Sequence, residues 1–303
     1  MNFHITFTGR EGRWWRRGAA ILAAVLIIIV AAVLLKPETQ IMNSVEISRV
    51  RERGILYVGV RDDVPGFNEG CEGVEPELAK LLAARLLPDS EEPYKLTVCS
   101  SKTVSTKLQD DSIDVAVAML PKGRSRSYAY SYPYYTDEVC IVTLKKGLVA
   151  ANPVDLLLGY VQDTPAAEVL ADYKKEVTAV KEQTILEKLF KKPDETYVVE
   201  QAKQMELHKY GSYEELIAAL MRGDVEGAVM AGAFVKKYFE VYAAEYTGRA
   251  KYFINNNIIG TIEYSIVSSS DEPALMQLAD MMIYEMKKDG SLDRLLAEYG
   301  LGD

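Results

Sequence analysis

The chain has 303 residues, three cysteines, two histidines and a formal net charge of −9, and its length leaves ample sequence for the core of one or two domains. The cysteines are too few for a disulfide scaffold and lack metal-ligand spacing, and two histidines argue against a histidine metal site or a Ser/His triad. Residues 1–35 carry a net charge of +3, from four arginines and Glu11, so the remainder carries −12 and is a poor binder of nucleic acid or anionic lipid. We therefore expect no cofactor, no metal and no nucleic-acid partner.

Residues 18–35 form an uncharged, almost entirely aliphatic segment that is long enough to cross a bilayer. The arginines before it place residues 1–17 in the cytoplasm and everything after the segment outside, and Trp14 and Trp15 fit an interfacial belt. A cleaved secretory signal is the alternative, but its apolar region should be shorter, and residues 34–37 make a poor cleavage site. The sequence thus predicts a cell-membrane protein with a retained anchor at 18–35 and an extracytoplasmic domain.

Strands and helices alternate through the first half of this domain. A polar linker at 36–47 is followed by a strand at 55–60, a helix at 74–87, a strand at 96–98, a short helix at 104–108 and a strand at 113–119. Such alternation favours a mostly parallel sheet with helices on its faces. Cys71 and Cys99 leave a disulfide bridge open as an alternative to free thiols.

The second half continues the alternation. The expected elements are strands at 139–143, 160–162 and 225–230, a β-rich run at 258–268, and helices at 213–221, 233–246, 274–288 and 292–299. Thr164-Pro165 suits a helix start. Residues 171–210 are charged and irregular and are expected to hold two helices. Cys140 lies in an apolar run and is predicted to be a buried thiol, and His208 a surface residue.

The stretch from Arg124 to Tyr135 is the most informative part of the sequence. It follows the apolar strand at 113–119, and a guanidinium beside the carboxyl end of a strand can grip a carboxylate through two parallel hydrogen bonds. The aromatic run after it, broken by Pro133, is predicted to be a turn that feeds another strand. Together they predict a cleft that captures a small anionic molecule.

Several segments resemble the extracellular solute-binding proteins of the polar amino-acid type. The resemblance covers nearly everything from about residue 45 onward and is carried by the order and spacing of residues 50–67, 73–79, 108–115, 124–135, 213–230 and 289–299. It implies an α/β, two-lobed type 2 periplasmic-binding-protein fold, with two mixed sheets that are flanked by helices and joined by two crossing hinge strands. Lobe 1 would comprise 48–140 and 262–303, and lobe 2 would comprise 141–261. The crossings would lie near 138–145 and 257–267, and the lobes would close on a ligand between them.

The resemblance also implies roles for individual residues. Arg124 matches the family's clamp for the ligand carboxylate; the alternatives are a solvated charge or a pair with a nearby aspartate. Asp163 and Thr164 match the lobe 2 turn whose amides share that carboxylate at a helix N-terminus; an ordinary threonine cap fits equally well. Arg61 falls where some acidic-amino-acid binders place an arginine that reads the side chain, and a plain surface role is equally compatible.

The departures from the family concern the ligand amine. Met119 stands where a Thr or Ser is usual, and Pro121 has no N–H to donate to the carboxylate. The stretch 229–233 lacks the acid that usually receives the ammonium. Ser101 stands where an aromatic often stacks on the ligand, although Phe67 remains. The predicted ligand-binding residues are Arg61, Phe67, Met119, Arg124, Asp163 and Thr164.

The sequence therefore predicts a membrane-tethered, monomeric solute-binding protein that captures a small carboxylate-containing ligand without an amine and delivers it to an ABC permease. A ligand sensor or interaction module with a degenerate amino-acid site is the alternative. An enzyme is not expected, because Asp62, Asp63 and Asp163, the candidate acids for a dehydratase on this fold, are each explained as turn residues.

Overall fold

The computed structural model describes residue 22 and the ranges 41–100, 102–190, 205–241 and 251–302. The predicted anchor at 18–35, apart from Leu22, and Ser101 lie outside these residues. Within the described ranges, no helix combines the length and the apolar character needed to cross a membrane.

One continuous mixed sheet runs through the molecule, in the order β2-β1-β3-β9-β4-β7-β5-β6. Its strands are β1 (Leu56–Val60), β2 (Tyr94–Val98), β3 (Val115–Pro121), β4 (Tyr128–Thr143), β5 (Leu157–Val161), β6 (Glu206–Tyr210), β7 (Gly227–Ala231), β8 (Phe253–Ile254) and β9 (Gly260–Ser269). The trios β2-β1-β3 and β6-β5-β7 are parallel, whereas β4 and β9 pair antiparallel with each other and with their other neighbours. The two expected sheets are thus connected by β4 and β9 into one hydrogen-bonded ladder.

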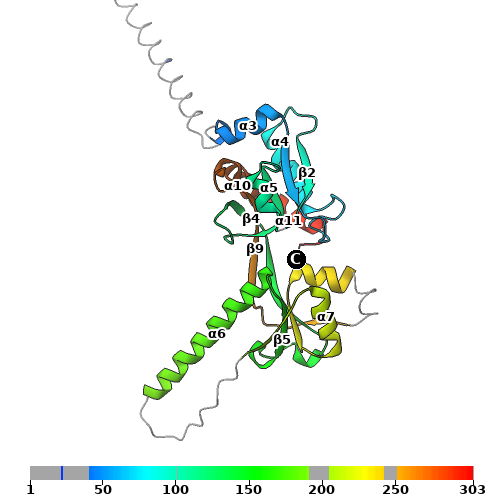
Figure 1. Ribbon diagram of the computed structural model, residues 1–303, viewed down its shortest axis with the longest axis vertical. Coiled ribbons are helices and arrows are strands. Elements are labelled where there is room, and N and C mark those ends of the chain that lie inside the picture. Colours follow the sequence, from blue (N-terminus) through cyan, green and yellow to red (C-terminus); the bar gives the residue numbers. More distant parts are fainter. Residues whose placement is uncertain (1–21, 23–40, 101, 191–204, 242–250, 303) are drawn as a thin grey trace, which may run out of the picture.

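Helices flank both ends of this ladder (Figure 1). The upper lobe carries α3 (Val45–Arg53), α4 (Val74–Leu86), α5 (Val104–Gln109), α10 (Pro273–Lys288) and α11 (Ser291–Glu298). The lower lobe carries α6 (Pro165–Phe190), α7 (Tyr213–Arg222), α8 (Gly232–Val235) and the π-helical turn η3 (Lys236–Val241), with the short 3-10 turns η1 (Lys146–Leu148) and η2 (Pro153–Asp155). The strands β4 and β9 run from one lobe into the other, which is the two-lobed α/β arrangement that the sequence predicted.

The upper lobe begins earlier than the sequence suggested. Residues 45–47 were expected to belong to the linker, but α3 starts at Val45, and Ile47 and Val50 are fully buried in the core. Ser44 caps the helix by accepting the Ile47 N–H at 3.3 Å, and Gly54 ends it with a left-handed φ of 76°. The linker prediction missed these capping residues.

The aromatic run after Arg124 is not a turn. Residues 128–143 form the single long strand β4, and β4 pairs with β9 from Tyr128 to Val139. The pairing register shifts on both sides of Pro133. Proline has no N–H to donate to β9, and this local irregularity lets the strand continue past it instead of ending there. The predicted turn at this position is therefore wrong.

The charged segment after Thr164 is described only in part. Residues 165–190 form one helix, α6, and residues 191–204 of the segment 171–210, where two helices were expected, lie outside the described residues. The part of the expected helix 233–246 that the structure describes divides into α8 and η3. His208 is exposed on β6, as predicted.

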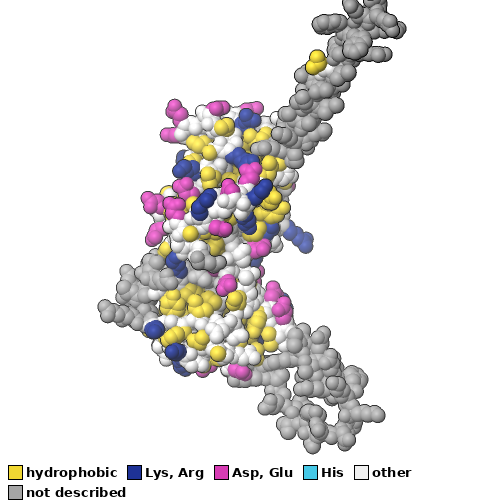
Figure 2. Space-filling model, turned by 180° about the vertical axis from the view of Figure 1, so that it is seen from behind, with side chains coloured by type: hydrophobic (Ala, Val, Ile, Leu, Met, Phe, Trp, Pro, Cys, Tyr) yellow, Lys and Arg dark blue, Asp and Glu magenta, His cyan; other side chains and the backbone are white. Residues whose placement is uncertain are grey.

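The core packs around the central strands and the helices that cover them. Its largest cluster includes α4 and α10 in the upper lobe and residues of β4, β7 and β9. The cysteines are free thiols, with Cys71 exposed and Cys99 and Cys140 buried, so the prediction of a buried Cys140 is confirmed. On the face seen in Figure 2, acidic side chains gather along one edge of the upper lobe and basic side chains are scattered, in line with the acidic charge of this part of the chain.

Candidate functional site

The two lobes meet beside the crossing strands. Val139 on β4 pairs with Gly260 of β9 and with Ala231 of β7, so the ladder passes from one lobe to the other at this residue. Side chains also join the lobes directly, since the Lys236 ammonium donates to the Gly300 carbonyl across the gap. The candidate site is the region enclosed between the lobes along this crossing.

Arg124 reaches from the loop after β3 to the first turn of α6 in the lower lobe. Its guanidinium donates to the Pro165 carbonyl at 3.0 Å and forms an ion pair with Glu168. Its side chain is 26% exposed, and that of Glu168 is 60% exposed. Arg124 therefore faces the other lobe and already holds a carboxylate there, one that belongs to the protein itself.

The turn before α6 is built as a helix cap. The Thr164 hydroxyl donates to the Val161 carbonyl at 2.8 Å and accepts the Ala167 N–H at 3.3 Å. Asp163, exposed beside it, has a left-handed φ of 58°. Asp163 and Thr164 thus place the N-terminus of α6 opposite Arg124, and the capping role accounts for the threonine hydroxyl in this structure.

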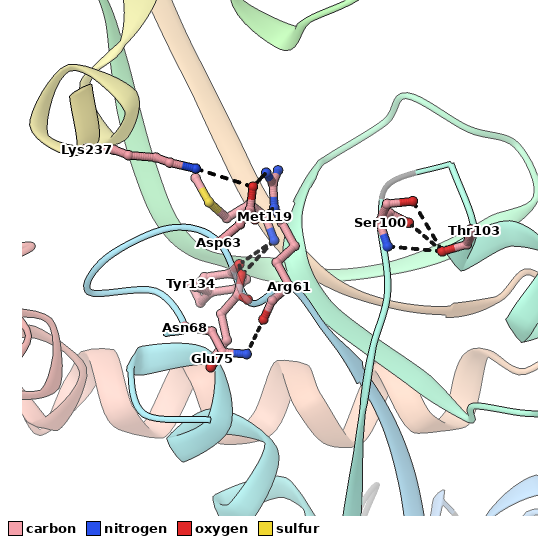
Figure 3. Close-up of polar contacts among 9 residues, drawn as sticks. All are labelled: Arg61, Asp63, Asn68, Glu75, Ser100, Thr103, Met119, Tyr134 and Lys237. Carbon is pink, nitrogen blue, oxygen red and sulfur yellow. Dashed lines mark hydrogen bonds and ion pairs between the residues drawn. The ribbon is translucent and has the colours of Figure 1, made fainter. Parts of the chain in front are cut away.

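Arg61 lies at the end of β1 and grips Asp63 with two hydrogen bonds, from Nε to Oδ1 at 2.8 Å and from Nη2 to Oδ2 at 2.9 Å (Figure 3). The guanidinium lies 5.6 Å from the centre of the Phe234 ring in the lower lobe. Lys237, also in the lower lobe, reaches Asp63 Oδ2 at 3.5 Å. Burial opposes ionisation of Asp63, but Arg61 and then Lys237 outweigh it and lower the pKa of Asp63. A low pKa does not suit Asp63 to the general-acid or general-base role considered for it.

The sequence reasoning missed Lys237. It lies in a Lys-Lys pair within the helix expected at 233–246, and paired lysines on a helix normally indicate a solvated face. In the structure only 11% of its side chain is exposed. The local sequence carried no signal for this, because the burial depends on how the lobes meet.

Met119 ends the straight part of β3 with a left-handed φ of 48°. Its N–H donates to Glu75 Oε1 at 2.7 Å and lies 3.2 Å from the Tyr134 hydroxyl, which itself donates to Glu75 Oε1 at 2.8 Å (Figure 3). The Met119 amide is therefore already engaged, and Met119 itself is buried, so this residue offers a ligand neither its N–H nor an exposed side chain.

Glu75 is fully buried beneath this network, and burial raises the pKa of its carboxyl to about 8 against the hydrogen bonds from Tyr134 and Met119. Its Oε2 has no hydrogen-bond partner among the described residues. Glu75 is not among the residues predicted from the sequence, although it shares one helix face with Leu78, Ala79 and Leu82, and that spacing indicates the buried side of α4.

Phe67 lies in the core instead of the cleft wall. It is fully buried, and its ring packs edge-on against Tyr135 and Tyr264, with centroids 5.0 and 6.3 Å away. It offers no surface to a ligand in this structure. The residues that the sequence grouped with it are thus brought together only in part, with Arg61 and Arg124 at the lobe interface, Met119 at the end of β3, and Phe67 behind them.

Asp137 occupies the crossing on β4 and is almost completely buried. It accepts the Ala233 N–H at 3.2 Å at the start of α8, and burial raises its pKa to about 6 against the hydrogen bonds from Ala233 and Gly232. A Cβ on Gly232 would lie 2.7 Å from Asp137 Oδ1, so glycine permits this close approach. Asp137 therefore anchors α8 on the crossing strand.

Two cavities border the lobe interface. One, of about 390 Å³, is lined by Lys102 from the upper lobe and by Asp163, Thr164, Ser212 and Tyr213 from the lower lobe. The other, of about 440 Å³, is lined by Arg61, Asp63, Ser100, Thr103 and Lys107. A further cavity of about 580 Å³ lies between α4, α10 and α11, is lined by Leu81, Met282 and Leu295 among others, and includes none of the predicted ligand residues.

The fold is matched among proteins of known structure. A mutant of ArgBP from T. maritima is 20% identical, with 84% of this chain and 98% of that chain covered and a TM-score of 0.56. AbpA, an amino acid ABC transporter substrate-binding protein from Streptococcus pneumoniae bound to L-arginine, is 19% identical over 83% and 97% of the two chains, with a TM-score of 0.55. The ancestral amino acid-binding protein AncCDT-1, a precursor of cyclohexadienyl dehydratase, is 17% identical over 84% and 98%, with a TM-score of 0.53.

The sequence itself matches a family model over residues 56–302, which is most of the chain. That model describes the bacterial extracellular solute-binding proteins, family 3. The crossing strands, the two lobes and the family match agree, and the chain belongs to the bacterial extracellular solute-binding proteins of family 3.

Proposed function

We propose that this protein captures a small carboxylate-containing solute between its lobes and delivers it to an ABC permease. The observation that carries the proposal is the position of Arg124, which extends from the upper lobe to the N-terminal turn of α6 in the lower lobe. A ligand carboxylate at this point would receive the guanidinium from one lobe and helix N–H groups from the other. Such a ligand would stabilise the closed form, because it contacts both lobes at once.

The ion pair between Arg124 and Glu168 does not prevent this. Both side chains reach solvent, Glu168 over 60% of its surface, and exposed pairs of this kind contribute roughly 0–1 kcal/mol. A ligand carboxylate held in two-point geometry by Arg124 can displace so weak a partner. Glu168 then acts as the group that fills the carboxylate position while no solute is bound.

The residues around the proposed ligand position favour a ligand without an amine. The stretch 229–233, where an acid would be needed to receive the ammonium, contains no Asp or Glu, and residues 229–231 of it pair with β4. The Met119 N–H is taken up by Glu75, and Pro121 has no N–H. An enclosed ammonium without a counter-charge would cost several kcal/mol. Amino acids nevertheless belong in the test, because structurally similar proteins are described as bound to L-arginine and to glutamine.

The remaining features belong to the same proposal. We place the protein outside the cytoplasm as a monomer tethered by residues 18–35, with lobe 1 at 48–140 and 262–303 and lobe 2 at 141–261. A binding role rather than a catalytic one is proposed, because the two buried acids with raised pKa values, Glu75 and Asp137, are enclosed by protein groups.

One observation favours the second candidate function, a sensor or interaction module. Two carboxylates of the protein itself already form ion pairs with the arginines at the lobe interface, Glu168 with Arg124 and Asp63 with Arg61. If these ion pairs stay closed, the two lobes keep one fixed arrangement, and a partner protein can recognise the surface that this arrangement forms.

Thermal unfolding in the presence of amino acids, keto acids, monocarboxylates and dicarboxylates separates these candidates. A solute at 100 times its Kd should stabilise the protein by about 2.7 kcal/mol, seen as a rise in Tm. Arg124→Met should abolish the rise, whereas Arg126→Met, on the same loop and exposed, should preserve it. If no compound in the panel raises the Tm of the unmodified protein, the solute-binding proposal is wrong and the interaction module remains.

A further inference from the structure

Two consecutive lysines of the lower lobe reach the upper lobe. Lys236 and Lys237 begin the π-helical turn η3; the Lys236 ammonium donates to the Gly300 carbonyl, and the Lys237 ammonium lies 3.5 Å from Asp63 Oδ2. In Figure 3 the Lys237 side chain extends from η3 towards Asp63. A π-helical turn is wider than an α-helical one, so consecutive side chains diverge less, and such turns are frequent at functional sites. One turn of the lower lobe therefore contacts the upper lobe at two points.

The first contact is at the C-terminal end of α11. Gly300 follows this helix with a left-handed φ of 69°, and its N–H donates to the Ala297 carbonyl at 3.0 Å. The next N–H, that of Leu301, donates to the Leu296 carbonyl at 2.8 Å. These bonds form a Schellman cap, and the carbonyl end of a helix favours a positive charge beside it. Since a Cβ on Gly300 would lie 2.8 Å from the Lys236 ammonium, the glycine both ends the helix and leaves room for this cation.

The second contact is with a carboxylate that the upper lobe orients. Arg61 donates to both oxygens of Asp63, at 2.8 and 2.9 Å, and so fixes the direction of the carboxylate. Only 11% of the Lys237 side chain is exposed, so its ammonium gives up hydration where the lobes meet. Asp63 and the Tyr238 ring, 5.5 Å from the ammonium, compensate for this loss. Without the Asp63 charge, Arg61 and Lys237 would be two like charges facing each other from opposite lobes.

The two contact points belong to one continuous surface of the upper lobe. Gly66, in the turn after Asp63, has a φ of +81°, and a Cβ there would lie 2.8 Å from the Tyr299 carbonyl oxygen and 3.2 Å from the Leu301 side chain. Residues 299–301 therefore pack directly on the turn that carries Asp63. The turn follows β1 and residues 299–301 follow α11, so opposite ends of the domain sequence meet here, facing η3 (Figure 1).

These contacts are separate from the position proposed for the solute carboxylate. Arg124 reaches Pro165 and Glu168 on α6, whereas the contacts of Lys236 and Lys237 involve neither Arg124 nor α6. All the groups that meet at η3 belong to the protein. Because they meet only when the lobes are together, their interaction free energy favours the closed form over an open one whether or not a solute is bound.

We propose that Lys236 and Lys237 form a latch that holds the lobes closed through protein groups alone, by capping α11 and pairing with Asp63. The lobes then close before a solute binds, and a solute enters only when the latch opens. Arg61 and Asp63 act in this latch as positioning residues. The proposal goes beyond the proposed function, and it does not depend on which solute is bound.

Double electron–electron resonance on the full chain, in buffer without added solute, tests the latch. One spin label is attached to Cys71, the exposed native cysteine in the upper lobe, and the other to Lys209→Cys, at an exposed position of β6 in the lower lobe. Cys99 and Cys140 are buried and should stay unlabelled. The distance between the labels then reports whether the lobes are closed or open.

We expect a single short distance in this labelled protein. Replacing both latch lysines, by Lys236→Met with Lys237→Met, should add a longer distance and raise the ratio of open to closed molecules at least about tenfold, roughly the contribution of one charge-assisted hydrogen bond. Lys175→Met is the matched control. Its ion pair with Asp172 is exposed and lies within α6, so its loss should leave the distance unchanged.

Asp63→Asn tests the latch from the upper lobe, and it keeps the test decisive if the lysine variant fails to fold. It removes the anion between Arg61 and Lys237, so the longer distance should appear here too. Distances identical to those of the unmodified protein in these variants would overturn the proposal, as would a predominance of the longer distance in the unmodified protein. Since no solute is added, the failure of every carboxylate to raise the Tm would contradict the proposed function and leave this result unaffected.

Discussion

At the residue scale, Glu75 links three elements in the buried part of the upper lobe. Its carboxyl, at the start of α4, receives the Met119 N–H at the end of β3 and the Tyr134 hydroxyl on β4. Complete burial raises its pKa to about 8, so the neutral acid is the favoured form below that pH. The core of the upper lobe thus contains a group whose charge depends on pH near neutrality.

This placement predicts how the stability of the fold depends on pH. The folded pKa of about 8 lies above the ordinary value of 4.5, so below pH 4.5 both states bind the proton and the contribution is fully present. Between pH 4.5 and 8 the unfolded state releases the proton first, and the free energy of unfolding falls by a few kcal/mol. Urea unfolding at pH 5, 6.5, 8 and 9 should show a shallower fall in Glu75→Gln.

The matched control is Glu77→Gln, on the same helix but 36% exposed and near Lys80. It should leave the pH profile as it is in the unmodified protein. Parallel profiles for Glu75→Gln and the unmodified protein would show that the Glu75 carboxyl is not the titrating group.

At the element scale, the start of α4 depends on one glycine. Gly73 precedes the helix with a φ of +143°, and a Cβ there would lie 2.2 Å from the Phe67 carbonyl oxygen. Gly73→Ala should therefore destabilise the fold by at least about 2 kcal/mol, from backbone strain and the clash together. Gly70→Ala, also left-handed but with nothing within 4 Å of its Cβ, should cost only about 1 kcal/mol. Equal losses of Tm in the two variants would show that the clash does not matter.

Elements with strong local periodicity and end signals, such as α4, α7 and α10, were predicted within a few residues. The strand β4 was not, because its continuity through Pro133 depends on pairing with β9, more than a hundred residues away. The helix α6 starts at the Thr164-Pro165 signal that the sequence offers, and its Lys, Glu and Leu residues are good helix formers.

The residues of the candidate site could likewise be predicted only where the local sequence determines their position. Arg124 could be predicted to face the other lobe, since a strand end and a helix start determine its position. Lys237 could not, because its burial arises only where η3 meets the loop after β1. Phe67 was placed in the cleft by resemblance, yet it packs on Tyr135 and Tyr264 in the core.

At the scale of the whole molecule, the lobes are joined by two strands and by a few side chains that cross the gap. The ion pair between Arg124 and Glu168 is one of these, and it competes with a solute for the guanidinium. Glu168→Gln should therefore raise the affinity for a bound carboxylate, by less than about fivefold because an exposed pair contributes at most about 1 kcal/mol. Titration calorimetry with succinate measures this, and Glu176→Gln, exposed on the same helix, is the control. A fall in affinity would mean that Glu168 supports the closed form more than it competes.

The central claim is that the solute binds between the lobes with a carboxylate on Arg124. A crystal structure of the protein with the compound that raises its Tm most tests this directly. We predict a ligand carboxylate within hydrogen-bond distance of the Arg124 guanidinium and of the first turn of α6, with Glu168 displaced. A ligand bound in the cavity between α4, α10 and α11, with the ion pair of Arg124 and Glu168 intact, would contradict the account.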